Sequence, residues 1–301
     1  MRFPSPAPWA AYARARAGEA LGGVPITGLE LLQEGPAGPV LLATSADGRA
    51  AVIKIAASGP GQGAHFARTA AVIAAADRAG VPVPRVLAAE DADGTGGWTY
   101  LALEHVAGLP WRELRPRLAA EEVHDAHAQI AAAMAALHAI RFSSFGELDH
   151  TVSPGGRSLL DAVRERGDLR ITDPERRRVF ERALDRSRHL FDSAVPATLC
   201  HDDLHHGNVV FRRHGERWEL AAILDWDKAW AGPAESDCAR VAFWDDMTGP
   251  GSWSAYPEGE PRTPEQRVRA MVYQLLWCLE YDDASPRHAA DTAALRRRLG
   301  V

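Results

Sequence analysis

The sequence predicts an α+β protein of two lobes: a small N-terminal lobe built on an antiparallel sheet and a larger, mostly helical C-terminal lobe. Short runs of β-forming residues, separated by turn residues, fill the first third of the chain. After a connector at residues 105–110, which contains Gly108 and Pro110, longer helical patterns dominate. The lobe boundary is therefore expected at this connector, with an N-lobe over residues 1–106 and a C-lobe over residues 107–301.

The first lobe opens with three β-type runs, and a turn at residues 45–48 separates the second from the third. An Ala-rich helix should follow and end at Gly80, because the prolines beyond it cannot donate to the helical ladder. Two further runs should close the sheet as a hairpin. The expected strands cover residues 28–33, 40–44, 50–55, 86–89 and 98–104, and the expected helix covers residues 61–79.

The second lobe should consist of helices interrupted by one hairpin, residues 209–224. Several of the helices begin near a proline, which is tolerated in the first turn because the amide hydrogens there have no helical partner. Residues 249–264, rich in Gly, Pro and Glu, are expected to form a surface loop. The expected helices cover residues 118–140, 158–166, 174–194, 233–247, 264–281 and 287–299.

Composition limits the function classes. The chain has 301 residues, of which 46% are hydrophobic and 25% charged, so a sizeable buried core is expected. A net charge of -6 provides no basic surface for nucleic acid, which is not an expected partner. The three cysteines are widely spaced and fit a reducing cytoplasm better than a disulfide framework. No signal-length or bilayer-length apolar segment is present, so neither secretion nor membrane insertion is expected.

The most informative pattern lies in residues 200–208 and 223–227. Asp203 precedes Asn208 by five positions, and Asp225 follows the predicted hairpin. This order is the one that kinase-type phosphoryl transfer uses. Asp203 is the predicted catalytic base, since a carboxylate can orient an acceptor hydroxyl and take its proton. Asn208 and Asp225 are the predicted Mg²⁺ ligands, provided that the hairpin brings them together, because Mg²⁺ prefers hard oxygen ligands.

Lys54 lies in an otherwise apolar strand and is predicted to contact the phosphates of a nucleotide. In kinases such a lysine pairs with a glutamate on the following helix. The expected helix at residues 61–79 contains no glutamate. A nucleotide-binding pseudokinase that has lost this pair therefore stays open as an alternative, although the intact Asp203, Asn208 and Asp225 argue against it.

A second alternative is a metal-dependent phosphohydrolase. The His-Asp pairs at residues 124–125 and 201–202, together with a later Asp, could supply metal ligands. Such a site needs its pairs on packed helices, whereas residues 201–202 follow a strand-like segment. His124 and His127 are instead expected on a solvated helix face, and His138 is expected to be a hydrogen-bonded packing histidine.

These motifs together resemble the aminoglycoside phosphotransferase family, the kinase-like enzymes that phosphorylate antibiotics, choline and related alcohols. The resemblance covers nearly the whole chain, and its specific parts are the catalytic loop and the second aspartate. It rests on Lys54, residues 80–84, 104–108, 137–138, 201–208, 224–226 and 237–239.

The resemblance implies a protein-kinase-like fold, with a nucleotide-binding N-lobe and a C-lobe that carries the catalytic loop and the acceptor-binding helices. It implies Mg²⁺ as cofactor and ATP or GTP as phosphate donor. By the resemblance, the purine is held by backbone groups from Glu104 to Val106, His201 braces the catalytic loop, and Asp237 anchors this loop from the next helix. It also assigns Asp203 as the catalytic Asp, Asn208 and Asp225 to Mg²⁺, and Lys54 to the phosphates.

Three positions depart from the family pattern. Asp202 stands where the family usually has Gly, His206 where it usually has Pro, and Thr69 about where the helix glutamate is expected. The first two substitutions should leave catalysis intact. The third leaves the partner of Lys54 undefined.

The acceptor is expected to be a hydroxylated small molecule such as a natural-product antibiotic, whose phosphorylation would confer resistance. Between residues 241 and 286 the acidic residues outnumber the basic ones, and an acidic acceptor cleft would suit a cationic substrate. Tryptophans in the second lobe could stack on the acceptor or fill the core. The acidic residues are Asp245, Asp246, Glu258, Glu260, Glu265, Glu280, Asp282 and Asp283, and the tryptophans are Trp230, Trp244, Trp253 and Trp277.

Overall fold

The computed structural model describes residues 8–35, 38–58, 65–91, 97–192, 195–244, 246–281 and 285–301. The chain forms two compact units. Unit 1 comprises Met1–Arg78, Pro82–Ala107 and His150–Val152, and unit 2 comprises Ala79–Val81, Gly108–Asp149 and Ser153–Val301. No helix among the described residues combines the length and the apolar character that crossing a bilayer requires.

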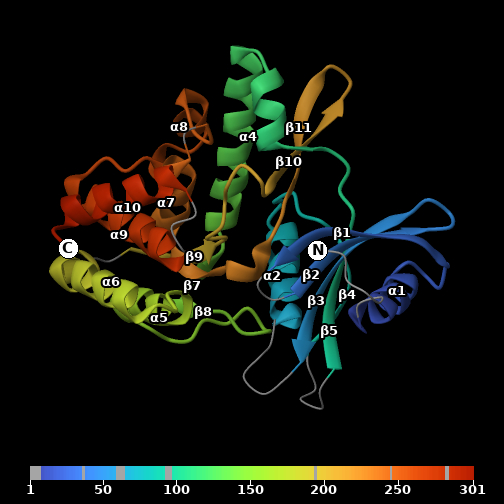
Figure 1. Cartoon of the computed structure of the whole chain (residues 1–301). Coiled ribbons are helices and arrows are strands. Elements are labelled where there is room, and N and C mark those ends of the chain that lie inside the picture. The colour runs from blue at the N-terminus through green and yellow to red at the C-terminus, as the bar shows by residue number, and fades with distance from the viewer. Residues whose placement is uncertain are drawn as a thin grey trace. The chain divides into compact units, whose positions relative to one another are not determined.

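Unit 1 is built on a five-stranded antiparallel sheet in the order β1-β2-β3-β5-β4 (Figure 1). All five strands coincide closely with the predicted runs, and α2 coincides with the described part of the predicted helix. The predicted start of that helix at Gly61 lies outside the described residues. The elements are β1 Ile26–Gly35, β2 Gly38–Ser45, β3 Ala50–Ser58, α2 Phe66–Arg78, β4 Val86–Glu90 and β5 Gly97–Glu104.

An additional helix, α1 (Pro8–Ala20), covers one face of this sheet and was not predicted. Its residues Ala13 and Ala17 are fully buried against apolar side chains of β2, β3 and β5. Small alanine side chains allow the helix to approach the sheet closely, so an Ala-rich face can replace the larger apolar residues expected of a packed helix. Helix α2 packs on β4 and β5, on the other side of the sheet (Figure 1).

Unit 2 consists mainly of helices, as predicted, and four of its predicted helices begin at side-chain caps or prolines. Ser158, Asp173, Thr263 and Ser285 each accept a hydrogen bond from an amide in the first helical turn. The helices are α3 Trp111–Leu114, α4 Ala120–His138, α5 Leu159–Arg170, α6 Pro174–Ser187, α7 Ala234–Phe243, α8 Pro250–Ala255, α9 Pro264–Glu280 and α10 Pro286–Leu299. Apolar residues of α5, α6 and α9 form most of one hydrophobic cluster in the core of this unit.

One predicted loop is wrong. Residues 249–264 contain helix α8 and the short 3₁₀ helix Pro257–Gly259. Helix α8 packs against α4, and Gly251 permits this contact because a side chain there would meet the backbone oxygen of His124 at 2.3 Å. The glycines that suggested a loop therefore allow close helix packing.

Two small sheets position the candidate site within unit 2. The first has the order β11-β10-β6 and contains the predicted hairpin, and the second has the order β7-β9-β12-β8. Gly108, just before β6, allows this strand to approach β10, since a side chain there would lie 2.4 Å from the oxygen of Phe211. The strands are β6 Leu109–Pro110, β7 Arg141–Phe142, β8 Gly146–Glu147, β9 Ala197–Cys200, β10 Val209–His214, β11 Arg217–Ile223 and β12 Trp230–Pro233.

Candidate active site

The candidate catalytic residue Asp203 lies on the loop that joins β9 to β10. This loop is braced by His201, which is fully buried. The Nδ1 atom of His201 accepts the amide of Asp203 at 3.1 Å, so the ring proton is on Nε2, which donates to the oxygen of Leu224 at 2.9 Å. The His201 ring also lies 4.6 Å from the ring of Trp226. His201 thus ties the loop of Asp203 to the segment that carries Asp225, as expected.

The hairpin brings Asn208 and Asp225 to the same end of unit 2. Strands β10 and β11 pair from Val209 opposite Ile223, and the amide of Leu224 extends the ladder by donating to the oxygen of Asn208 at 2.8 Å. Asp225 follows directly, with a left-handed backbone at φ +66°. Asp225 and Asp202 are two of the three non-glycine residues with positive φ in the described chain. Uncommon backbone conformations of this kind concentrate at functional sites.

The oxygen atoms that could act as metal ligands at this end of the hairpin suit a hard cation. The Nδ2 atom of Asn208 donates to the backbone oxygen of Asp203 at 3.0 Å, so its amide oxygen is the atom left for other contacts. Asp225 adds a half-buried carboxylate one residue after Leu224, whose amide pairs with the oxygen of Asn208. One amide oxygen and one carboxylate, completed by phosphate and water oxygens, are the kind of ligands that Mg²⁺ takes.

Asp203 is itself 6% exposed and lies between two basic side chains. Arg240 on α7 donates from Nη2 to Oδ1 at 2.6 Å, and the Nζ atom of Lys228 lies 3.7 Å from Oδ2. Burial opposes ionisation of Asp203, but Lys228 and Arg240 outweigh it and lower the pKa of this carboxyl. Burial lowers the pKa of His205 to about 4, so this neighbouring ring is neutral at pH 7. Asp203 is therefore an ionised carboxylate at neutral pH.

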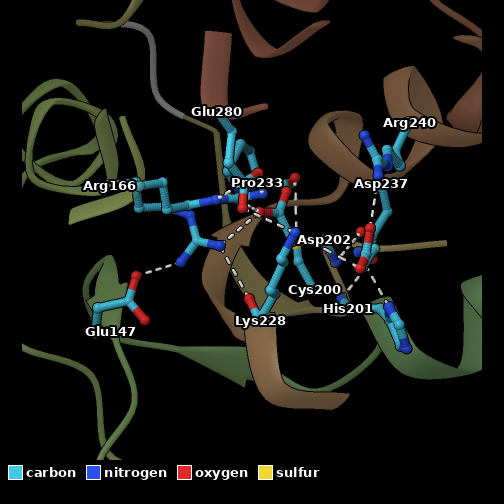
Figure 2. Close-up of polar contacts among 12 residues, drawn as sticks. Glu147, Arg166, Cys200, His201, Asp202, Lys228, Pro233, Asp237, Arg240 and Glu280 are labelled. Carbon is cyan, nitrogen blue, oxygen red and sulfur yellow. Dashed lines mark hydrogen bonds and ion pairs between the residues drawn. The ribbon is translucent and has the colours of Figure 1, made fainter. Parts of the chain in front are cut away.

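Asp202, the residue in place of the usual Gly, is buried and adopts φ +61°. Its carboxylate accepts hydrogen bonds from Arg166 and Arg170, which lie one turn apart on α5. Arg166 also bonds to Glu147 (Figure 2). Arg170 bonds to Glu280. Burial opposes ionisation of Asp202, but the two arginines lower its pKa. The departure from the family pattern is thus compensated by a buried ionic network.

We expect Asp202→Gly to destabilise the protein. Glycine would relieve the left-handed backbone, a gain of about 1 kcal/mol. Loss of the carboxylate leaves the buried Arg166 and the largely buried Arg170 without this partner, which costs about 3–5 kcal/mol. The net loss should be about 2–4 kcal/mol, seen as a lower melting temperature in calorimetry. Asp202→Asn, which keeps the volume but removes the charge, should lose a similar amount. Unchanged melting of both variants would contradict a stabilising role for the network.

Asp237 on α7 anchors the loop that carries Asp203. It is fully buried, and its two carboxylate oxygens accept the amides of His201 at 2.8 Å and Asp202 at 2.6 Å. His138 at the end of α4 contacts the same carboxylate at 3.1 Å and the hydroxyl of Tyr256 at 3.0 Å. The expectations for Asp237 as an anchor and for His138 as a packing histidine are confirmed.

His138, Cys200 and Asp237 also form a group of possible metal ligands, whose donor atoms lie within 4.8 Å of one another. Each is already engaged in hydrogen bonds, since Cys200 donates to the oxygen of Pro233 at 3.3 Å. Burial raises the pKa of the Cys200 thiol well above its usual value, which keeps it protonated, whereas a metal binds the thiolate. The group is a hydrogen-bonded packing cluster.

The histidine and aspartate pairs considered for a phosphohydrolase do not form such a site in the described chain. His124 and Asp125 are exposed on α4, whereas the donors of residues 201 and 202 are engaged in the contacts above. His127, expected on a solvated face, is instead buried beside Trp111, and its Nε2 atom contacts the oxygen of Asp246 at 3.1 Å. The expectation was wrong for His127 because α8 and the segment after α7 cover that face of α4.

The nucleotide-binding residues predicted for the first lobe all lie in unit 1. Lys54 pairs with Leu101 across β3 and β5, and it points to the face opposite α1, because its neighbours Ile53 and Ile55 are buried under that helix. Glu104 ends β5, and its amide donates to the oxygen of Arg85 at 2.9 Å. Val106 is half-buried just beyond β5.

Thr69, at the position where the helix glutamate is expected, cannot replace an acidic partner for Lys54. Its side chain is buried on α2, and Oγ1 donates to the backbone oxygen of His65 at 3.3 Å. A threonine hydroxyl carries no charge, so it cannot supply the ion pair that a glutamate makes.

Of the acidic residues expected to line an acceptor cleft, Asp245, Asp282 and Asp283 are outside the described residues, whereas Glu258 and Glu260 line one small cavity together with Glu235. Among the described ones, Glu280 contacts the charged cluster around Asp203, but its carboxylate is bound by Arg170 and Lys228. Glu260 pairs with Arg262. Of the four tryptophans, Trp230 and Trp277 are buried and Trp244 and Trp253 are partly exposed.

Sequence reasoning missed the basic residues of the site. For Arg166 and Arg170 the sequence contains one signal that could have found them: their spacing of four residues places both on one face of a helix. For Arg240 and Lys228 the sequence contains no such signal, since each meets its acidic partner only through the tertiary fold.

An antiparallel sheet with a helical second unit, and a loop and hairpin that gather Asp203, Asn208 and Asp225, define a kinase-like fold of the phosphotransferase class. The profile of the phosphotransferase enzyme family matches residues 29–267. The chain therefore belongs to this family, as the motifs indicated. No curated protein sequence matches the chain.

Solved structures agree on the fold. The aminoglycoside phosphotransferase APH(4)-Ia is 20% identical, with a TM-score of 0.64 over 91% of this chain and 92% of that one. A thermostable mutant of it has been solved with AMP-PNP and hygromycin B. A putative fructosamine-3-kinase from Thermobifida fusca is 22% identical, with a TM-score of 0.62 over 95% of this chain and 96% of that one. At these identities the likeness concerns the fold, and it confirms the predicted α+β, kinase-like class.

Proposed function

We propose that this phosphotransferase moves the γ-phosphoryl group of a nucleoside triphosphate, ATP or GTP, to a hydroxyl group of a small molecule. The observation that carries the proposal is the position of Asp203: an ionised, nearly buried carboxylate on a loop that hydrogen bonds hold next to Asn208 and the start of the Asp225 segment. We assign unit 1 to nucleotide binding and unit 2 to catalysis and acceptor binding.

In the proposed reaction Asp203 accepts a hydrogen bond from the acceptor hydroxyl and holds its oxygen in line with the γ-phosphorus. The bond from this oxygen to phosphorus forms while the bond from phosphorus to the bridging β,γ-oxygen breaks. The hydroxyl proton passes to Asp203 late in the step, and the products are a phosphomonoester and a nucleoside diphosphate. Since the ionised form of Asp203 is favoured by its basic neighbours, the carboxylate is ready to accept this proton at neutral pH.

Asn208 and Asp225 would hold Mg²⁺, which when bound neutralises phosphate charge. Lys54 would contact the phosphates, and backbone groups from Glu104 to Val106 would bind the purine. The amides of Glu104 and His105 already donate to the oxygens of Arg85 and Ala50, so we assign the base to the other backbone groups of this stretch. We also propose that the protein acts in the cytoplasm, where its three free, buried cysteines would stay reduced.

We propose a natural-product antibiotic as the acceptor class, so that phosphorylation confers resistance. Trp244, which is partly exposed and lies 4.8 Å from the His206 ring, offers an aromatic surface near Arg240 and Asp203. The carboxylates around Asp203 are already paired with an equal number of basic side chains. The carboxylates are those of Glu147, Asp202, Asp203 and Glu280, and the basic side chains are Arg166, Arg170, Lys228 and Arg240. A cationic group on the acceptor, if there is one, should therefore lie away from the reacting hydroxyl.

A screen tests this function. The purified protein should show a higher melting temperature with Mg²⁺ and ATP or GTP, and it should consume nucleotide in the presence of one or more antibiotics from an aminoglycoside, nucleoside and cyclic-peptide panel. Mass spectrometry should find the acceptor heavier by one phosphoryl group. Nucleotide binding without consumption on the whole panel would favour the pseudokinase, and phosphoester hydrolysis with Mn²⁺ and no nucleotide would favour the hydrolase.

A further inference from the structure

The two carboxylate oxygens of Asp203 have different surroundings. Oδ1 receives a hydrogen bond of 2.6 Å from Nη2 of Arg240. Oδ2 faces the Nζ atom of Lys228, but at 3.7 Å this contact is an ion pair without a hydrogen bond. One oxygen is therefore bound by the protein, whereas the other has a cation nearby and still has room for a hydrogen-bond donor.

Arg240 is fixed in its place by packing. Its side chain is 4% exposed, and its guanidinium carbon lies 4.8 Å from the centre of the Trp277 ring and 5.7 Å from that of Trp244. Arginine stacks favourably on aromatic faces, so these rings hold the guanidinium plane in one orientation. Arg240 also lies one helical turn after Asp237 on α7, the residue that anchors the loop of Asp203. The same helix therefore holds both the backbone and the side chain of the catalytic loop.

Lys228 is held away from Oδ2 by two other partners. Its Nζ atom lies 2.9 Å from Oε1 of Glu280 and 2.5 Å from the hydroxyl of Tyr281. Glu280 is in turn bound by Arg170. Because these contacts satisfy the ammonium group, Lys228 supplies positive charge beside Oδ2 without occupying the hydrogen-bonding position of that oxygen.

We propose that Arg240 is a positioning residue of the transfer reaction: by binding Oδ1, it directs Oδ2 of Asp203 toward the acceptor, so that Oδ2 receives the hydroxyl proton. This inference rests on the proposed function. It follows from geometry, since a carboxylate with one oxygen fixed can rotate little about its terminal bond, and a general base must lie within hydrogen-bond reach of the proton that it takes.

The test compares Arg240→Met, Arg240→Lys and the matched control Arg269→Met. Arg269 is also 4% exposed and also binds a residue of α7, since its Nη2 atom lies 2.8 Å from Oε2 of Glu235, and no described contact joins it to Asp203. For each variant we would measure the melting temperature, its increase with Mg²⁺ and ATP, and kcat and KM for the acceptor found in the screen, with nucleotide hydrolysis by water as a second rate.

Arg240→Met should lower kcat about 100-fold, the loss typical of a misplaced catalytic group, with a KM for the acceptor within about 3-fold of wild type. Arg240→Lys, which can still donate to Oδ1 but lacks the planar guanidinium that stacks on the two tryptophans, should lose only about 3- to 10-fold in kcat. Arg269→Met should melt earlier but keep its kcat. All three should retain the increase in melting temperature with nucleotide.

Two results with an active wild type would overturn the positioning role and leave the proposed function intact. The first is an unchanged kcat in Arg240→Met, and the second is a loss of kcat in Arg269→Met as large as that in Arg240→Met. If Arg240→Met does not fold, the kcat of Arg240→Lys decides: a loss no greater than that of Arg269→Met contradicts the inference. A wild type that neither transfers phosphate nor hydrolyses nucleotide would contradict the proposed function, and the positioning role would fall with it.

Discussion

Asp203→Asn should lower kcat about 1,000-fold or more while the protein still binds Mg²⁺ and ATP. The substitution keeps the size of the side chain and an oxygen that can accept the hydrogen bond from Arg240. It removes the negative charge and the ability to take a proton, and general-base catalysis contributes about 10²–10⁴-fold. Because Asn208 and Asp225 are unchanged, the increase in melting temperature with Mg²⁺ and ATP should persist.

The measurement is nucleotide consumption with the acceptor from the screen, together with the thermal shift. Asp125→Asn is the matched control, since it makes the same chemical change at an exposed position of α4 and should leave kcat unchanged. Retention of more than a tenth of the wild-type kcat by Asp203→Asn would remove Asp203 from the role of catalytic base. Loss of the thermal shift together with activity would instead show that Asp203 supports nucleotide binding.

The backbone of this site could be predicted because its signals are local. An Asp and an Asn five residues apart follow an apolar strand, and a hairpin with a short turn returns the chain to the second Asp. In an antiparallel hairpin the residues at the two open ends must be neighbours, so the pairing of Asn208 with Leu224 follows from the pattern. The helices with caps and first-turn prolines could be predicted for the same reason.

The charged environment could not be predicted in this way. Arg170 and Glu280 are 110 positions apart, and Arg240 and Asp203 are 37 positions apart. Which arginine meets which carboxylate depends on how α5, α7 and α9 pack, and no periodicity or spacing encodes that choice. Helix α1 was missed for a related reason, because Ala13 and Ala17 can be recognised as its buried face only when the sheet beneath it is known.

The structure also gives a physical reason for the substitution of Asp202 for the usual Gly. A left-handed residue at this point favours Gly, but Asp is among the residues that tolerate this conformation. The added carboxylate is buried, so it requires compensation, and Arg166 and Arg170 supply it. A sequence comparison identifies the departure at Asp202 but not the two arginines that accompany it.

Among the substitutions proposed for this chain, Asp237→Ala should have the largest effect on stability. Its carboxylate accepts the amides of His201 and Asp202 and contacts His138, all in a fully buried setting. Alanine would leave two buried amides without acceptors, at about 1–3 kcal/mol each, and would add a small cavity. We expect a loss of about 3–5 kcal/mol, a large part of the roughly 5–15 kcal/mol that stabilises a typical domain.

The measurement is urea unfolding followed by tryptophan fluorescence, which reports mainly on unit 2 because most of the tryptophans lie there. Glu258→Ala, at an exposed position, is the control and should change the free energy of unfolding by no more than about 0.5 kcal/mol. Asp237→Asn should fall between the control and Asp237→Ala, because it keeps the volume and one acceptor oxygen but places an amide donor against a backbone amide. An unfolding midpoint of Asp237→Ala equal to that of the control would mean that the loop of Asp203 does not depend on this anchor, and that His201 and its contact with Leu224 hold the loop in place.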